Sequence, residues 1–109
     1  MIKPKVKIRG IIACPGNIRG KVWKIEDPIQ VPRVRKKAII VTTFTTPILA
    51  PAISEALAIV CETGGLTSHS AIIAREFGIP CLVGAKGVLA AFVDGQTVEI
   101  KDGTIYAVK

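Results

Sequence analysis

The sequence has few aromatic side chains and few charges. Of its 109 residues, 5% are aromatic and 21% are charged, whereas 50% are hydrophobic. Few aromatic rings leave few platforms for stacking nucleobases, which argues against a single-stranded RNA-binding protein. The low charge and high apolar content exclude general disorder. A chain of this length has room for one core, so we expect a single domain over residues 1–109.

Histidine and cysteine are too sparse for a structural zinc site. The chain has one histidine, and Cys14, Cys61 and Cys81 form no CxxC pair, so we expect no metal. An odd number of cysteines among apolar neighbours, without an expected signal peptide, fits a reducing compartment and predicts a cytoplasmic protein. No apolar run reaches about 18 residues, so we expect no membrane-spanning helix.

The sequence also lacks the motifs of a self-sufficient nucleotide enzyme. It contains no GxxxxGK[ST] loop, and its acidic residues are scattered rather than clustered for magnesium. We therefore expect no cofactor bound by the chain itself. Ser68 and Ser70 flank the histidine, but adjacent helical residues diverge and do not form a nucleophile–base pair.

Positive charge is concentrated in the first third of the chain. Residues 1–37 have a net charge of +9 and the remainder −2, which together give +7. Such a basic segment attracts acidic partners or nucleic acid, or it is simply a solvated strand face. The basic residues in this segment are Lys3, Lys5, Lys7, Arg9, Arg19, Lys21, Lys24, Arg33, Arg35, Lys36 and Lys37.

Alternating strand and helix patterns predict one compact α/β domain. Strands are expected at Lys5–Ala13, Lys21–Ile25, Lys37–Thr42, Ala58–Glu62 and Cys81–Val83. One helix is expected to open at Thr46-Pro47, and another to be capped by Thr67 or Ser68 and to run to Phe77. Turn signals at Pro15-Gly16-Asn17, Asp94-Gly95 and Asp102-Gly103 predict β hairpins flanking central, mostly parallel strands.

The most informative segment is GGLTSHSAIIAREFGIPCLVG, residues 64–84. It places Gly64, Gly65, Thr67, Ser68 and His69 between a strand and a helix. Glycines expose backbone N–H groups, the hydroxyls add donors, and a helix start presents further unpaired N–H groups, so the segment is suited to an anion. An imidazole there is placed to attack a phosphoryl donor and to hold the resulting dianion on these donors.

A simpler interpretation explains the same residues. A capping histidine and two glycines that close a tight turn need no phosphoryl chemistry. On the residues alone both interpretations remain open.

The segment resembles the signature of the mobile, phosphohistidine-bearing domain of phosphoenolpyruvate-utilising enzymes, in which a GG-x-T-S/C-H core precedes a helix and a G-I-P-x-x-V-G ending. Two further stretches resemble the same family. The opening segment of the domain is matched by ACPGNIRGKVWKIEDP, and its closing hairpin is matched by DGQTVEIKDGTIY. The resemblance implies a swivelling β/β/α sandwich. It further implies that His69 carries the phosphoryl group, that Thr67 contacts it and that Gly64 and Gly65 form the loop beside it.

The resemblance also implies partners. This chain contains neither an ATP-grasp module nor a phosphoenolpyruvate-binding barrel, so we expect both to act in trans, as separate chains or beyond the given sequence. Two residues depart from the family pattern: relatives usually have an acid at the position of Thr46 and frequently have one at the position of Thr63.

Two other functions compete with a phosphoryl carrier. A swivelling domain serves as a non-catalytic lid in aconitase-like enzymes, so this chain is alternatively a lid or a regulatory subunit of a larger enzyme. The TSH triplet at residues 67–69 discriminates, because a lid has no need of it. Nucleic-acid binding through the basic segment, which we do not expect, would show a steep salt dependence.

Overall fold

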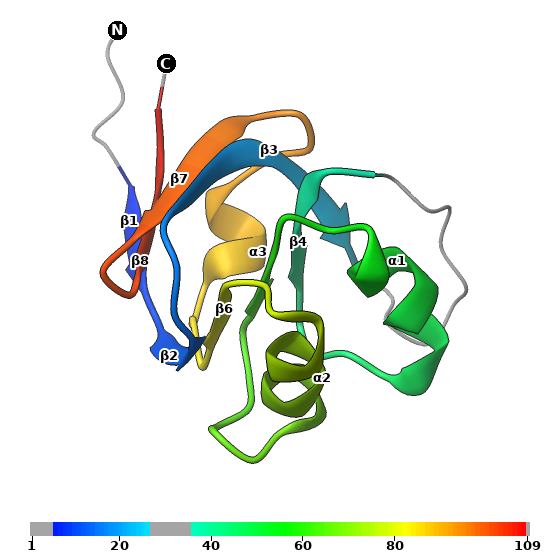
Figure 1. Cartoon of the computed structure of the whole chain (residues 1–109). Coiled ribbons are helices and arrows are strands. Elements are labelled where there is room, and N and C mark those ends of the chain that lie inside the picture. Colours follow the sequence, from blue (N-terminus) through cyan, green and yellow to red (C-terminus); the bar gives the residue numbers. More distant parts are fainter. Residues whose placement is uncertain (1–5, 27–35, 109) are drawn as a thin grey trace, which may run out of the picture.

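The computed structural model describes residues 6–26 and 36–108, which form a mixed eight-stranded sheet with helices on both faces (Figure 1). In chain order the elements are β1 (Lys7–Arg9), β2 (Ile11–Cys14), β3 (Ile18–Ile25), β4 (Ala38–Thr42), the 3-10 turn η1 (Pro47–Leu49), α1 (Ala50–Ser54), β5 (Ala58–Cys61), α2 (His69–Phe77), β6 (Cys81–Val83), α3 (Val88–Ala91), β7 (Thr97–Lys101) and β8 (Thr104–Ala107).

The centre of the sheet is parallel and its flanks are antiparallel. The strand order is β1-β8-β7-β3-β4-β5-β6-β2, with β3, β4, β5 and β6 parallel to one another. The expected α/β class and central parallel strands are confirmed. The hairpin at Asp102-Gly103 is also confirmed, because both turn residues have the positive φ angles, 52° and 78°, of a tight two-residue turn between β7 and β8.

The expected N-terminal hairpin is wrong. β2 pairs with β6 and β3 pairs with β4 and β7, so the strands on either side of Pro15-Gly16-Asn17 do not pair with each other. The expected strand Lys5–Ala13 is divided at Gly10. Its first residue, Lys5, lies outside the described part of the chain. The Gly10 N–H donates to the Gly103 carbonyl at 2.9 Å, and a Cβ at Gly10 would lie 3.1 Å from the Leu82 Cβ.

Asp94-Gly95 also differs from expectation, because it leads from α3 into β7 rather than closing a hairpin. The Lys24 N–H donates to Asp94 Oδ1 at 2.6 Å, which holds this turn against β3. The short helix α3 was not predicted. It forms because Val88 and Phe92, at its two ends, are both buried in the core.

Two apolar cores lie on opposite faces of the central strands. Alternate residues of β4 point to opposite faces: Ile40 packs with α1 and α2, whereas Val41 packs with α3 and with the strands β7 and β8. This arrangement gives the β/β/α layering that the family resemblance implied, with α1 and α2 as the outer helical layer (Figure 1). It also explains why the sequence of β4 is continuously apolar.

Three cysteines lie close to α2 and none forms a disulfide. Cys61 and Cys81 are buried, and burial raises the pKa of Cys61 to about 11 and that of Cys81 to about 12. These values exceed the ordinary thiol pKa of 9.0, so the folded chain binds the thiol protons more tightly than the unfolded chain. The resulting stabilisation is complete below pH 9.0 and is lost as the pH rises through the folded-state values.

We therefore expect the free energy of unfolding to fall between about pH 8 and about pH 10.5 through these thiols. Urea unfolding at both pH values, compared between the wild-type chain and a Cys81→Ala variant, isolates the contribution of Cys81. As the pH rises, the free energy of unfolding should fall less in the variant than in the wild-type chain. An equal loss in both proteins would contradict the assignment.

Of the expected basic segment, Lys3, Lys5, Arg33 and Arg35 lie outside the described residues. Across residues 6–26 and 36–108, no helix has the length and apolar character to cross a membrane.

Candidate functional site

The candidate site lies where β4 and β5 end. Because these strands are parallel, the loops at their carboxyl ends meet at one edge of the sheet. Thr63, after β5, donates both its backbone N–H and its hydroxyl to the carbonyl of Thr43, after β4, at 3.1 and 2.9 Å. These bonds fix the loop that carries the GGLTSH sequence, residues 64–69, against the loop that contains Thr45.

Ser68 caps the N-terminus of α2. Its backbone is extended, its hydroxyl donates to the Gly65 carbonyl at 2.8 Å, and its Oγ accepts from the Ala71 N–H at 3.4 Å. Of the two caps that the sequence allowed, Thr67 and Ser68, the structure selects Ser68. At the other end, Gly78 terminates the helix in the left-handed conformation, as expected.

The two loop glycines differ in what they contribute. Gly64 has a φ of +99°, and a Cβ there would lie 3.0 Å from Ser68 Oγ and 3.1 Å from Ser68 Cβ. Gly65 has no such φ, and a Cβ there would meet nothing within 4 Å. Only Gly64 is therefore required by the backbone and by the capping serine.

This difference provides a matched pair of variants. We expect Gly64→Ala to destabilise the fold by roughly 1–3 kcal/mol, since it imposes a strained φ and displaces Ser68, whereas Gly65→Ala should change stability by less than about 0.5 kcal/mol. Urea unfolding of both variants measures the two values. Equal destabilisation would show that the loop does not depend on Gly64 in this way.

A series of hydrogen bonds between polar side chains holds the His69 ring. His69 Nδ1 lies 2.8 Å from Thr45 Oγ1, which lies 2.8 Å from Ser70 Oγ, and the Cys61 thiol donates to Ser70 Oγ at 3.1 Å. Thr45 and Ser70 are buried, 5% and 3% exposed, while His69 is half-buried at the surface. Thr45 engages Nδ1, and among the described residues no hydrogen bond involves Nε2.

The loop and the helix start present unused hydrogen-bond donors. Within the described residues, the backbone N–H groups of Leu66, Thr67, His69 and Ser70 have no acceptor. The Thr67 side chain is exposed and makes no hydrogen bond with a described residue, whereas the Ser68 hydroxyl is already engaged in the cap. Unpaired amides at the start of a nine-residue helix suit an anion.

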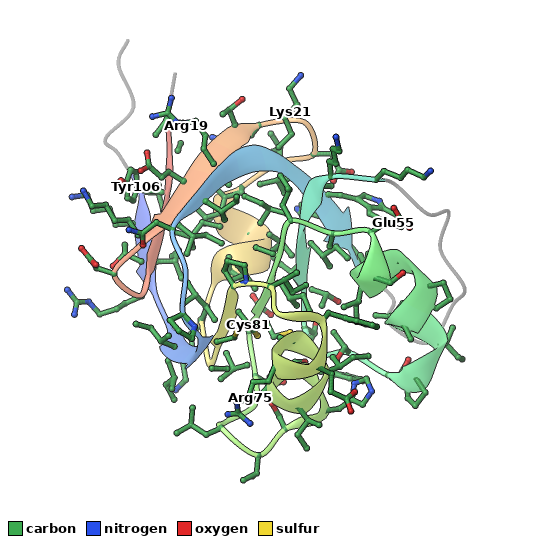
Figure 2. All side chains as sticks on the ribbon, viewed as in Figure 1. Arg19, Lys21, Glu55, Arg75, Cys81 and Tyr106 are labelled. Atoms are coloured by element: carbon green, nitrogen blue, oxygen red, sulfur yellow. The ribbon has the colours of Figure 1, made fainter. Side chains whose placement is uncertain are left out.

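Arg75 ties this loop to the body of the domain. From α2, its Nη2 donates to the Leu66 carbonyl at 2.7 Å and its Nε donates to the Ala13 carbonyl of β2 at 3.0 Å. Figure 2 shows Arg75 on α2. Sequence reasoning treated this residue only as part of the family signature and did not assign it this role.

Large apolar side chains are exposed on the segments that carry Thr45 and His69. Phe44, next to Thr45, is 42% exposed, and Ile48, which follows in η1, is also 42% exposed. Leu66 in the loop is 52% exposed and Ile72, one turn along α2 from His69, is 50% exposed. We call these four residues the apolar rim. The sequence analysis missed them because their exposure depends on the fold.

Fold and site together define an α/β domain that displays one half-buried histidine, with Nε2 unengaged, at the start of a capped helix. The family described as PEP-utilising enzyme, mobile domain, matches residues 34–104. The chain belongs to this family.

Relatives in the family are much longer than this chain. Phosphoenolpyruvate synthase of Pyrococcus furiosus is 43% identical over 100 residues, which cover 92% of this chain and 12% of the relative. Phosphoenolpyruvate synthase of Aeropyrum pernix is 37% identical over 108 residues, 94% of this chain and 13% of the relative. The chain thus spans about an eighth of the length of these relatives.

Solved structures share the fold. Enzyme I (nEIt), solved by solution NMR, is 25% identical, with a TM-score of 0.58, and the match covers 71% of this chain and 33% of that chain. Aconitase X of Thermococcus kodakaraensis has a TM-score of 0.73 at 15% identity and covers 95% of this chain and 99% of that chain. The likeness to aconitase X concerns the fold alone, so the fold does not choose between a carrier and a lid.

Proposed function

We propose that this chain is a phosphoryl carrier that accepts a phosphoryl group on His69. The observation that carries the proposal is the hydrogen bond of 2.8 Å between His69 Nδ1 and Thr45 Oγ1. A side chain that merely capped the helix would not require a buried hydroxyl to orient its ring. The bond turns a half-buried imidazole so that Nε2 is the reactive nitrogen.

In the reacting tautomer, Nδ1–H donates to Thr45 Oγ1 and the Thr45 hydroxyl donates to Ser70 Oγ. The Nε2 lone pair attacks phosphorus and forms an N–P bond, while the bond from phosphorus to the leaving oxygen of the donor breaks and that oxygen keeps the electron pair. We expect the unpaired N–H groups of Leu66, Thr67, His69 and Ser70 to donate to the new dianion. A reverse attack by an acceptor oxygen returns His69 to its starting form.

Donor and acceptor chemistry must come from elsewhere, because this chain spans only about an eighth of its relatives. Our proposal assigns the two partner sites to an ATP-grasp-type protein and a phosphoenolpyruvate/pyruvate-binding barrel, which act in trans or in a longer chain. Three free thiols suit the reducing cytosol, where we place these partners. The apolar rim is the surface that we expect each partner to cover.

An Ile72→Glu variant tests the rim. Burying a carboxylate against an apolar partner surface carries a desolvation penalty, so we expect the KM for the partner to rise about 10-fold, equivalent to about 1.4 kcal/mol. Val93→Glu is the matched control, because Val93 is 63% exposed and lies outside the rim. Equal effects of the two variants on KM would refute the rim as a docking surface.

The carrier function is tested with radiolabelled phosphoenolpyruvate or ATP. The domains that bind the donor are supplied by a phosphoenolpyruvate synthase whose own mobile domain has been inactivated. We call them the donor-site domains. We expect label on this chain that is released by acid and retained in base, as a phosphoramidate should be. Absence of label, or label that resists acid, would rule out the proposed carrier.

A further inference from the structure

A concave surface away from His69 lies on the outer face of β1, β8 and the turn that joins β7 to β8. It has a volume of about 310 Å³ and lies at the small end of the size range of small-molecule sites. Its lining residues are Lys7, Arg9, Lys101, Asp102, Thr104 and Tyr106, which we call the basic groove.

The strand register places the cations of the basic groove on one face. Lys7 pairs with Tyr106 across β1 and β8, and Thr104 pairs with both Arg9 and Lys101. Because side chains alternate along a strand, Ile105, between Thr104 and Tyr106, points inward and is buried. Three cations from two separate strands therefore converge on one concavity.

The positive charge of the groove is not neutralised. Asp102 is the one carboxylate in the lining, and none of its three cations forms an ion pair within residues 6–26 and 36–108. Elsewhere on the sheet, Arg19 is neutralised by Glu99 at 3.2 Å. Lys7 Nζ lies 5.8 Å from the centroid of the Tyr106 ring, a contact that does not cancel the charge of the ammonium.

We propose that the basic groove binds a compact polyanion, a small metabolite with two or more phosphate groups. Three convergent cations match at least two anionic groups, and the hydroxyls of Thr104 and Tyr106 supply further donors. Among the described residues, Arg19 is paired with Glu99, so Arg19 does not extend the three cations into the longer basic stripe that a nucleic-acid backbone would need. This binding site goes beyond the carrier function.

The groove is separate from the His69 site. Tyr106 lies at the edge formed by β1 and β8, whereas Arg75 lies on α2, well apart from it in the same view (Figure 2). A polyanion in the groove would therefore leave the loop at residues 64–69 free, and binding there does not depend on phosphoryl transfer.

Inorganic tripolyphosphate is the probe. Calorimetric titration at low ionic strength should give saturable binding of one ligand, and Arg9→Gln and Lys101→Gln should each weaken it by about fivefold to tenfold. Lys86→Gln removes the same charge from an exposed position outside the groove and should bind as the wild-type chain does. No saturable binding, or an equal loss in Lys86→Gln, would overturn the proposal.

Amide shift mapping by NMR with the same probe locates the ligand. Shifts should be confined to β1, β8 and the turn between β7 and β8, and His69→Ala should bind unchanged, which separates this site from the carrier. Shifts at residues 65–70 instead would place the polyanion at the helix start and overturn the groove. Displacement of tripolyphosphate by a lower concentration of a short DNA duplex would also overturn it, in favour of nucleic acid.

Discussion

A His69→Ala variant is expected to accept no phosphoryl group, because it removes the one imidazole of the chain. The nitrogen that attacks phosphorus has no substitute nearby, since the hydroxyls of Ser68 and Ser70 are engaged in the helix cap and in the Thr45 contact. Incubation with a labelled donor and the donor-site domains, followed by separation under alkaline conditions, measures the loss.

The variant should remain folded. His69 is half-buried and contributes one hydrogen bond to a threonine that keeps a second partner, Ser70, so we expect a loss of about 1 kcal/mol in stability. Circular dichroism and urea unfolding check this value. Acid-labile label on a folded His69→Ala variant would place the phosphoryl group elsewhere.

The second large effect is expected from Thr45→Val, which removes a hydroxyl and keeps the side-chain shape. Without Oγ1 the ring loses the partner that selects its orientation and tautomer. We expect the rate of phosphoryl transfer to fall by about 10- to 100-fold, the size of effect seen when the hydrogen-bond partner that orients a metal-ligating histidine is removed. Single-turnover transfer from a saturating donor measures this step.

Thr45→Ser is the matched control, since it restores the hydroxyl without the methyl group. It should recover most of the rate, while both variants lose about 1 kcal/mol or less of stability because Ser70 keeps its contact with Cys61. A slow Thr45→Ser variant, or a fast Thr45→Val variant, would show that the hydroxyl does not orient the ring.

Much of the central fold could be predicted because its signals are local. The continuous apolar runs of β4 and β5 are dictated by burial on both faces, and α2 is delimited by Ser68 and Gly78 in adjacent sequence. The pairing of β1 and β2 could not be predicted in the same way. It depends on contacts with β8 and β6, more than 60 residues away, and Gly10 allows the chain to pass from one edge of the sheet to the other.

The candidate site could likewise be predicted only where its residues are close together in the sequence. The cluster of Gly64, Gly65, Thr67, Ser68 and His69 was visible because its members lie within six residues of sequence, and the structure keeps them on one loop and one helix start. Thr45 was missed because it lies 24 residues from His69 and reaches it only through the parallel pairing of β4 and β5. The polar residues that follow β4 were the available signal, since ends of parallel strands meet at one edge.

The most direct measurement is an NMR spectrum of the phosphorylated chain with ¹⁵N-labelled histidine. Our account predicts that phosphorus couples to one nitrogen, His69 Nε2, and that Nδ1 stays within the Thr45 hydrogen bond. Coupling to Nδ1 would mean that the ring leaves Thr45 in order to react, and the proposed orientation of the nucleophile would then be wrong.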